Sequence, residues 1–318
     1  MITFDIDVQT NSKYGKSPEE RTLEERLKRG FMILDKTNGP TSHQVTAWAR
    51  EMLGLDKLGH GGTLDPFATG VLLLLSGKAM KLAPTVLGHD KTYVAVVKFQ
   101  EEMDESVLRE ALSHFSGTIY NVPPEISAVK VQVRTRNIHA IELLESDRHL
   151  ALIHVECESG TYIRTLVNDL SLWLNVPAKL VELRRPKSGR YQLNHSISMQ
   201  QLADAHWRWK ELGDASVLES LIYPIEWLVK DLPKLVIKDS AVAAVSRGAP
   251  LMRPGLVSMD DEAKQNHDVA IMSMKDELVA IGKLLVSPSD LPSMISGEVS
   301  IPKQVFIDED TYPKGWVR

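Results

Sequence analysis

The sequence has little cysteine, no long apolar run and no excess of positive charge. Its 318 residues include one cysteine, Cys157, so the chain can form neither an internal disulfide nor a thiolate metal cluster. The apolar alternation LALIHVECE around Cys157 predicts a buried, inert thiol. No run of about 18 apolar residues occurs, and the first 30 residues lack the apolar core and cleavage site of a secretory signal. We therefore expect a cytoplasmic protein without a membrane segment.

The formal net charge of -5 gives no general basic surface of the kind that contacts phosphates. Two short segments nevertheless concentrate the basic residues, namely Lys130, Arg134 and Arg136, then Lys179, Arg184, Arg185, Lys187 and Arg190. Exposed charges more than about 8–10 Å apart are largely screened at physiological salt. A locally basic groove on an acidic protein can therefore still bind RNA.

The size and patterning predict two domains of the ordinary globular class. Hydrophobic residues make up 43% of the chain and charged residues 25%, and we find no internal repeat or low-complexity segment. We expect a charged extension over 1–30, a large domain over 31–230, and a smaller one over 231–318. Pro233 interrupts the pattern between the two domains and marks a linker.

Strand and helix patterns alternate irregularly in the large domain. Apolar and β-branched alternation predicts strands at 31–35, 71–76, 92–99, 139–145 and 150–158, and one more that runs from 119–123 into 126–134. Helical spacing predicts helices at 42–53, 106–115, 160–174, 199–212 and 217–229. This order favours an α+β fold with a mixed, mainly antiparallel central sheet over regular βαβ winding. Short strands around one helix at 239–249 predict a small β-barrel-like module.

The loop over 59–70, GHGGTLDPFATG, is the segment best suited to chemistry. Its glycines permit unusual backbone conformations and close approach of a ligand. Pro66 restricts Asp65 to extended backbone, which presents the carboxylate at a stiff loop tip. Such a carboxylate can act as nucleophile or base, although the spacing alone favours an ordinary Asp-Pro turn. His60 has no second histidine at helical spacing, which favours a loop histidine over a metal ligand.

The loop resembles the catalytic motif of the TruB family of pseudouridine synthases, in which the aspartate of GTLDP is catalytic. Further family segments follow in order over 31–190: LDKTNGPTSH, KTYVAV, PPEISAVKVQVRTR, CESGTYIRTLVNDL and ELRRPKSG. The C-terminal part, from LPKLVI to GKLLV, is similar to the PUA domain of the archaeal and eukaryotic H/ACA branch, which includes dyskerin. The resemblance implies a pseudouridine synthase fold with a PUA domain and a reaction that needs no metal or redox cofactor.

The resemblance also implies roles for single residues. Asp65 attacks C1′ of the target uridine or removes its 2′ proton, Tyr93 stacks on the extruded base, and Arg164 pairs with the carboxylate. Leu183 forms an apolar wall of the pocket, although a leucine in a strand is more often simply core. Weaker candidates for supporting the pocket or contacting RNA are Lys36, His60, Lys130 and Arg184.

Three functions remain open at this stage. The first is a guide-dependent enzyme, in which an H/ACA guide RNA pairs with rRNA and small partner proteins complete the particle. The second is a stand-alone enzyme that modifies the tRNA TΨC loop at U55, and the third is a non-catalytic RNA-binding scaffold. No long insertion separates Tyr93 from Ser127, where bacterial relatives carry a loop that grips tRNA, and this favours the guided form.

The sequence departs from the family pattern in two places. Thr37 stands where the family usually has proline after DK, and we expect little chemical consequence. The segment ELRRPKSGR carries Pro186, Lys187 and Arg190 where the family has ELRRTRSGP. The local pocket geometry at this second site is therefore open. Residues 231–318 also carry 13 acidic and 10 basic side chains, so this part of the chain is net negative. Shape recognition or partner proteins would have to compensate for this charge in RNA binding.

Overall fold

The computed structural model describes residues 1–123 and 132–313. The chain divides into two compact units, each assembled from separated segments. Unit 1 comprises Met1–Phe31, Leu75–Leu82 and Ala215–Arg318, and unit 2 comprises Met32–Leu74 and Ala83–Asp214. The boundary between the units falls inside two strands, because β2 (Gly30–Lys36) and β4 (Thr69–Ser76) each contribute residues to both.

Unit 2 contains a large sheet and five α-helices. Its other strands are β3 (Leu58–His60), β5 (Lys91–Phe99), β6 (Gly117–Asn121), β7 (Arg134–Asp147), β8 (Leu150–Cys157), β9 (Ala178–Ser188) and β10 (Tyr191–Gln192). Its helices are α2 (Ser42–Met52), α3 (Ala83–Leu87), α4 (Glu105–Ser113), α5 (Ile163–Leu174) and α6 (Met199–Leu212), with a 3-10 turn at Leu193–His195.

With β11 (Tyr223–Pro224) at one edge, the strand order of this sheet is β11-β2-β4-β9-β5-β8-β7-β6, with β3 on β4 and β10 on β9. The pairs β9–β5, β5–β8, β8–β7 and β7–β6 are antiparallel, whereas β4 and β9 are parallel. The mixed, mainly antiparallel sheet expected from the sequence is therefore present. Since β9 lies between β4 and β5, it brings the segments around residues 65, 93 and 184 together.

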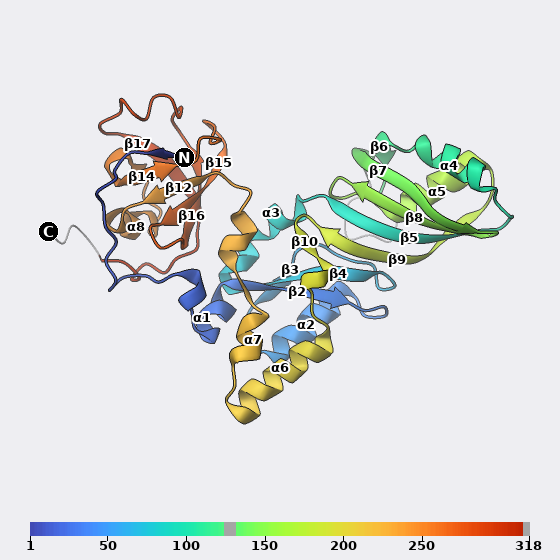
Figure 1. The fold of residues 1–318 in the computed structure, drawn as a ribbon, viewed down its shortest axis with the longest axis horizontal. Coiled ribbons are helices and arrows are strands. Elements are labelled where there is room, and N and C mark those ends of the chain that lie inside the picture. The colour runs from blue at the N-terminus through green and yellow to red at the C-terminus, as the bar shows by residue number, and fades with distance from the viewer. Residues whose placement is uncertain (124–131, 314–318) are drawn as a thin grey trace. The chain divides into compact units, whose positions relative to one another are not determined.

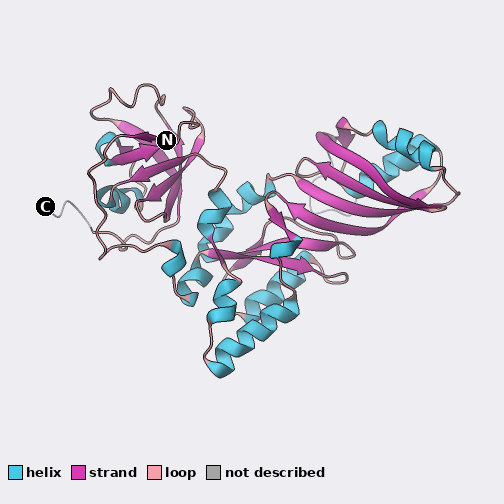
Figure 2. Ribbon diagram, viewed as in Figure 1, coloured by secondary structure: helices cyan, strands magenta, loops and turns pink. Residues whose placement is uncertain are grey.

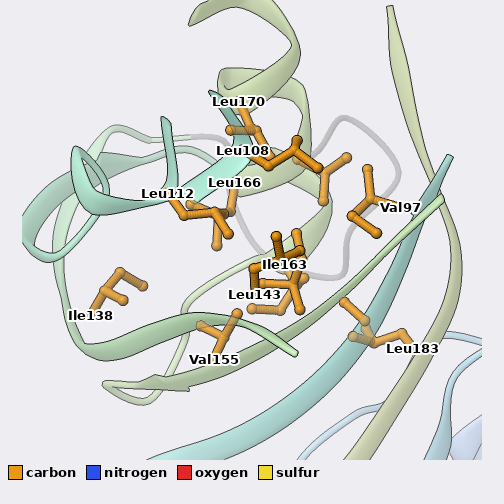
Figure 3. Close-up of a cluster of buried hydrophobic side chains, with 14 of the residues drawn as sticks. Val97, Leu108, Leu112, Ile138, Leu143, Val155, Ile163, Leu166, Leu170 and Leu183 are labelled. Atoms are coloured by element: carbon orange, nitrogen blue, oxygen red, sulfur yellow. The ribbon is translucent and has the colours of Figure 1, made fainter. Parts of the chain in front are cut away.

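Helices α4 and α5 cover one face of the strands β5, β7 and β8 (Figure 1). Their apolar stripes contribute Leu108, Leu112, Ile163, Leu166 and Leu170 to a buried cluster that inward-facing strand residues complete (Figure 3). Both helices are amphipathic and bury their apolar sides, as the spacing in the sequence predicts. Cys157 is fully buried in the same cluster, which confirms the expected burial of its thiol.

Unit 1 is built on a seven-stranded sheet with short helices (Figure 2). Its elements are β1 (Ile2–Thr3), α1 (Leu23–Lys28), α7 (Ser216–Ser220), β11 (Tyr223–Pro224), β12 (Lys234–Ile237), α8 (Asp239–Val245), β13 (Leu251–Met252), β14 (Leu256–Met259), β15 (Asp268–Ser273), β16 (Leu278–Leu284) and β17 (Glu298–Val305), with 3-10 turns at Pro18–Glu20, Gly77–Leu82, Ile225–Val229 and Arg253–Gly255. The strand order is β1-β14-β12-β15-β16-β17-β13, and only the β12–β15 pair is parallel. Strand β1 of the N-terminal extension pairs with β14.

The structure differs from the sequence expectation at 217–229 and at 178–188. The single helix expected at 217–229 is wrong: α7 ends at Ser220, and β11 follows. Pro224 cannot donate the helical hydrogen bond and disfavours helix at the residue before it, so Tyr223 pairs with Phe31 instead. The sequence pattern predicts no strand at 178–188, because charged residues and Pro186 interrupt the apolar alternation of β9. The middle of the strand expected from 119–123 into 126–134 lies outside the described residues.

Candidate active site

Asp65 lies on the loop between β3 and β4, in unit 2. One glycine before it and one after it allow the close packing of this loop. A side chain at Gly61 would have its Cβ 2.5 Å from Val86 Cγ1, and one at Gly70, which has φ +109°, would meet the Arg185 carbonyl oxygen at 2.3 Å. The backbone therefore approaches its neighbours more closely than any larger residue allows.

The Asp65 carboxylate forms an ion pair with Arg164. Arg164 Nη2 donates to Asp65 Oδ1 at 2.9 Å, and each side chain is 29% exposed. Arg164 is the second residue of α5, where the helix dipole disfavours a cation and favours an anion. The carboxylate thus compensates the guanidinium at the helix end and keeps one oxygen oriented.

The first turn of α5 is anchored to the end of β6. The Asn121 side chain is buried; its Nδ2 donates to the Tyr162 carbonyl at 3.2 Å, and its Oδ1 accepts from the Tyr162 N–H at 2.9 Å. Thr165 Oγ1 donates to the Val122 carbonyl at 2.6 Å. These bonds fix the helix start and therefore the position from which Arg164 reaches Asp65.

Tyr93 is half-buried on β5 and packs against the buried cluster of unit 2. Burial raises the pKa of its phenol, the Arg185 guanidinium acts against that shift, and the Asp65 carboxylate adds to it. Tyr93 is thus electrostatically coupled to both of these groups. The three side chains for which the sequence predicts a common site, Asp65, Tyr93 and Arg164, are neighbours in the structure.

Leu183 lies on β9 opposite Ala95 of β5 and is 7% exposed. It belongs to the apolar cluster that also contains Leu64 and against which Tyr93 packs (Figure 3). Its placement agrees with an apolar wall beside the loop and equally with a core residue.

Lys36 is buried, at 1% exposure, beneath the Asp65 loop. Its ammonium donates to the carbonyls of Thr37 at 2.9 Å, Pro66 at 3.0 Å and Ala68 at 2.8 Å, and more weakly to that of Asp65 at 3.3 Å. Burial lowers the pKa of Lys36, while the Asp65 carboxylate acts in the opposite direction. Of the two roles considered for Lys36, this placement favours support of the pocket over contact with phosphate.

The remaining candidates occupy different environments. Arg184 bonds Asp35 Oδ2 at 2.7 Å and Thr69 Oγ1 at 3.1 Å, with its side chain 43% exposed, so it remains accessible. His60 is half-buried and packs edge to face on His43 with ring centroids 4.7 Å apart. Burial lowers the pKa of His60, and His43 and the Arg185 guanidinium lower it further.

Lys130, the last of the candidates, lies outside the described residues. Pro186 stands at a β-bulge: Thr92 pairs with Lys187 and Val94 with Arg184, so two residues of β9 face Tyr93. Proline has no N–H for the ladder, and a bulge is one of the few places where a sheet accepts it.

Two residues that support the loop were not identified from the sequence. Ser42, the first residue of α2, accepts from the Leu64 N–H at 2.9 Å and donates to the Leu64 carbonyl at 3.1 Å. Arg185 is 1% exposed and bonds the loop carbonyls. The inward direction of one arginine could have been predicted from the adjacent residues 184 and 185. Successive strand residues point to opposite faces of a sheet, so one of the two must turn inward.

Family comparisons cover nearly the whole chain. Residues 50–163 match the model described as "TruB family pseudouridylate synthase (N terminal domain)", and 164–230 match "tRNA pseudouridylate synthase B C-terminal domain". Residues 233–306 match "PUA domain", and 5–46 match "DKCLD (NUC011) domain". The probable tRNA pseudouridine synthases B of Pyrobaculum aerophilum and Pyrococcus abyssi are 40% and 41% identical, covering 98% and 99% of this chain and 94% and 95% of theirs.

Solved structures give the same result. The chain resembles one from "Structure of H/ACA RNP bound to a substrate RNA containing 2'-deoxyuridine" with a TM-score of 0.90 and 38% identity, over 99% of this chain and 96% of that chain. It resembles one from "Crystal structure of the archaeal box H/ACA sRNP Nop10-Cbf5 complex" with a TM-score of 0.88 and 39% identity, over 99% and 98%. The expected pseudouridine synthase fold with a PUA domain is confirmed. The chain belongs to the TruB family of pseudouridylate synthases, which are RNA isomerases.

Proposed function

We propose that Asp65 is the catalytic carboxylate with which this protein isomerises uridine to pseudouridine in RNA. The reaction breaks the N1–C1′ bond, rotates the uracil and joins its C5 to C1′. The observation that carries the proposal is the ion pair between Asp65 and Arg164 on a tightly supported loop. The carboxylate either attacks C1′ or removes the 2′ proton, and both routes require it to be ionised and fixed in place.

Each neighbouring side chain has a physical role in this proposal. The guanidinium of Arg164 donates a charge-assisted hydrogen bond to one carboxylate oxygen and fixes its direction, which leaves the other oxygen for the ribose. A uridine inside a duplex or a folded loop cannot reach such a group, so the nucleotide must be extruded. The ring of Tyr93 would stack on the extruded base, a contact worth about 1–3 kcal/mol. Leu183 would close the pocket on its apolar side.

We propose that the protein works as the catalytic subunit of an H/ACA guide-RNA particle acting on rRNA. The support is its similarity, over nearly the whole chain, to solved chains whose titles name an H/ACA particle and the protein Nop10. A guide RNA that pairs with the target would supply most of the RNA recognition, and partner proteins would add surface. This arrangement fits a chain whose net charge is -5.

Direct action on tRNA is the second candidate. The curated relatives are named probable tRNA pseudouridine synthases B. For this second candidate we propose U55 of the TΨC loop as the target. The same Asp65 would serve both substrates. A non-catalytic scaffold is disfavoured, because Asp65, Tyr93 and Arg164 are all present and lie together.

Two further assignments remain proposals. We assign residues 1–30 to an N-terminal extension, 31–230 to the catalytic domain and 231–318 to the PUA domain and tail; the matches at 50–163, 164–230 and 233–306 support this division. We also propose that the protein acts in the cytoplasm. Within residues 1–123 and 132–313, no helix is long and apolar enough to span a membrane.

Pseudouridine formation by wild-type and Asp65→Asn protein separates the candidates. A tRNA transcript and an rRNA fragment are each incubated with and without an H/ACA guide RNA and partner proteins. Product from rRNA only with guide RNA supports the particle, and product from tRNA without guide supports the second candidate. No product under any condition, or an unchanged yield with Asp65→Asn, would overturn the enzymatic assignment.

A further inference from the structure

Arg185 holds both arms of the Asp65 loop from the neighbouring strand. Its Nε and Nη2 donate to the Val71 carbonyl at 2.9 and 2.7 Å, on the arm that follows Asp65. Nη2 also donates to the Gly62 carbonyl at 3.2 Å and Nη1 to that of Thr63 at 3.4 Å, on the arm that precedes it. One planar guanidinium therefore fixes the distance between the two arms, which the single ammonium of a lysine cannot do in the same way.

Three side chains together bind the inward-pointing carbonyls of this loop. Arg185 binds the two arms, Ser42 binds Leu64, and Lys36 binds the tip around Asp65. Only Arg185 also interacts with Tyr93. The two residues face each other at the β-bulge and point to the same side of the sheet as Leu183. The charge of Arg185 counteracts the burial that raises the pKa of Tyr93.

Burying the charged guanidinium of Arg185 costs free energy, because the group loses its water. The side chain is 1% exposed, and it forms no ion pair with any residue of the described segments. A buried cation without a counter-ion is tolerated only where fixed dipoles replace its water, and here the carbonyls of the loop do so. Its field also lowers the pKa values of Lys36, His60 and Lys91. Proteins keep energetically costly arrangements of this kind mainly at functional sites, where the reaction depends on a fixed geometry.

We propose that Arg185 is a positioning residue: it holds the Asp65 loop and the phenol of Tyr93 in a single geometry, so that carboxylate and stacking ring meet the extruded nucleotide together. This proposal rests on the proposed function. Arg185 touches neither substrate nor the Asp65 carboxylate directly and acts through the loop backbone and Tyr93. Its removal should therefore slow the chemical step while leaving the affinity for RNA intact.

The test compares Arg185→Lys and Arg185→Gln with wild type in the assembled, RNA-loaded state. Lys98→Gln, which removes an exposed cation of the adjacent strand β5, is the matched control. We expect the dissociation constant for RNA to stay within about threefold. The single-turnover rate should fall by about 100-fold for Arg185→Gln, as expected for a displacement of reacting groups by about 1 Å. Arg185→Lys should recover only part of this loss, since it restores the charge but not the fork.

A double-mutant cycle with Tyr93→Phe distinguishes positioning from simple stability. Tyr93→Phe keeps the stacking ring and removes the hydroxyl that interacts with Arg185, so it should slow the reaction without weakening RNA binding. In the Tyr93→Phe background, Arg185→Lys should cost less than it does alone. If the Arg185 variants do not fold, the rate of Tyr93→Phe decides the question, and a wild-type rate refutes the proposal.

Other outcomes are equally decisive. The positioning role is overturned if folded Arg185→Lys and Arg185→Gln react at the wild-type rate. It is also overturned if the rate losses of Arg185→Lys and Tyr93→Phe simply multiply in the double variant. If wild-type protein makes pseudouridine and Asp65→Asn does not, the proposed function stands whatever the Arg185 variants show. If wild-type protein makes none, it is the proposed function that fails.

Discussion

At the scale of single residues, breaking the ion pair between Asp65 and Arg164 should reduce activity much more than stability. Exposed or half-exposed ion pairs contribute about 0–1 kcal/mol to stability, and these side chains are each 29% exposed. We expect Arg164→Met to lower the free energy of unfolding by less than about 1 kcal/mol in urea titrations. The rate of pseudouridine formation should fall by at least about 100-fold, because the carboxylate loses its orienting partner. Asp35→Asn, which breaks the nearby Arg184 pair, is the control; a drop for it as large as for Arg164→Met would argue against a specific role.

Cys157 should be unreactive while the protein is folded. Burial raises the pKa of its thiol to about 12, and the side chain has no exposed surface. The thiolate is the reactive form, so a colorimetric disulfide reagent should label the native protein far more slowly than it labels protein in concentrated urea. As the chain has one cysteine, each labelled molecule reports this site. Rapid stoichiometric labelling without denaturant would contradict the burial.

The residues proposed to perform the chemistry could be predicted from the sequence more readily than the residues that support the Asp65 loop. Asp65, Tyr93 and Arg164 could be predicted because short motifs carry them, and their proximity depends on three separate elements. The role of Ser42 could not be predicted, because a structural serine looks like any other until its backbone partners are known. For Arg185, the alternation of strand residues predicts only that one arginine of the pair 184 and 185 turns inward, not what it binds. The partners of Arg185 are carbonyls, which leave no trace in a sequence.

At the scale of elements, the N-terminus of α2 fixes Ser42 beneath the Asp65 loop. Thr41 Oγ1 accepts from the Gln44 N–H at 3.1 Å, and Gln44 Oε1 accepts from the Thr41 N–H at 2.8 Å. Thr41→Ala should therefore lower the free energy of unfolding by about 1 kcal/mol in urea, the usual cost of losing such a cap. Gln44→Glu preserves the reciprocal pattern and should leave stability unchanged. Equal losses for both substitutions would show that the cap is not the cause.

Lys91 at the start of β5 should make stability depend on pH. Burial lowers its pKa from 10.5 to about 8, and Arg185 contributes. The unfolded chain then binds more protons than the native state above about pH 8, so the free energy of unfolding should rise with pH. The window ends near pH 9.0, where the Cys157 thiol begins to titrate in the unfolded chain and opposes the trend. Urea titrations across this window should show a smaller rise for Lys91→Met, and an equal rise would exclude Lys91 as the source.

At the scale of the molecule, a buried ion pair joins distant parts of unit 1. Arg21 Nη2 meets Glu226 Oε1 at 2.7 Å and Nη1 meets Oε2 at 2.9 Å, and Oε1 also accepts from the Leu278 N–H at 2.9 Å. The N-terminal extension, the segment after β11 and strand β16 thus share one carboxylate. Breaking such a pair leaves a buried, uncompensated charge and typically costs about 3–5 kcal/mol.

We therefore expect Arg21→Met to lower the thermal midpoint and the urea midpoint strongly. The double variant Arg21→Met with Glu226→Met should be more stable than the single one, because it removes the stranded carboxylate. Lys16→Met, which breaks an exposed pair with Glu25 in the same extension, is the control and should have little effect. A double variant less stable than Arg21→Met would contradict this explanation.

The sequence by itself determined the family, the catalytic motif and most elements, because local apolar periodicity and short motifs are properties of neighbouring residues. Tertiary structure alone decided which charged residues turn inward, why Pro186 is accepted in β9, and how Lys36, Ser42 and Arg185 share the loop carbonyls. These features depend on contacts between residues far apart in the chain. Strand order places β9 beside both β4 and β5, and no local pattern encodes that adjacency.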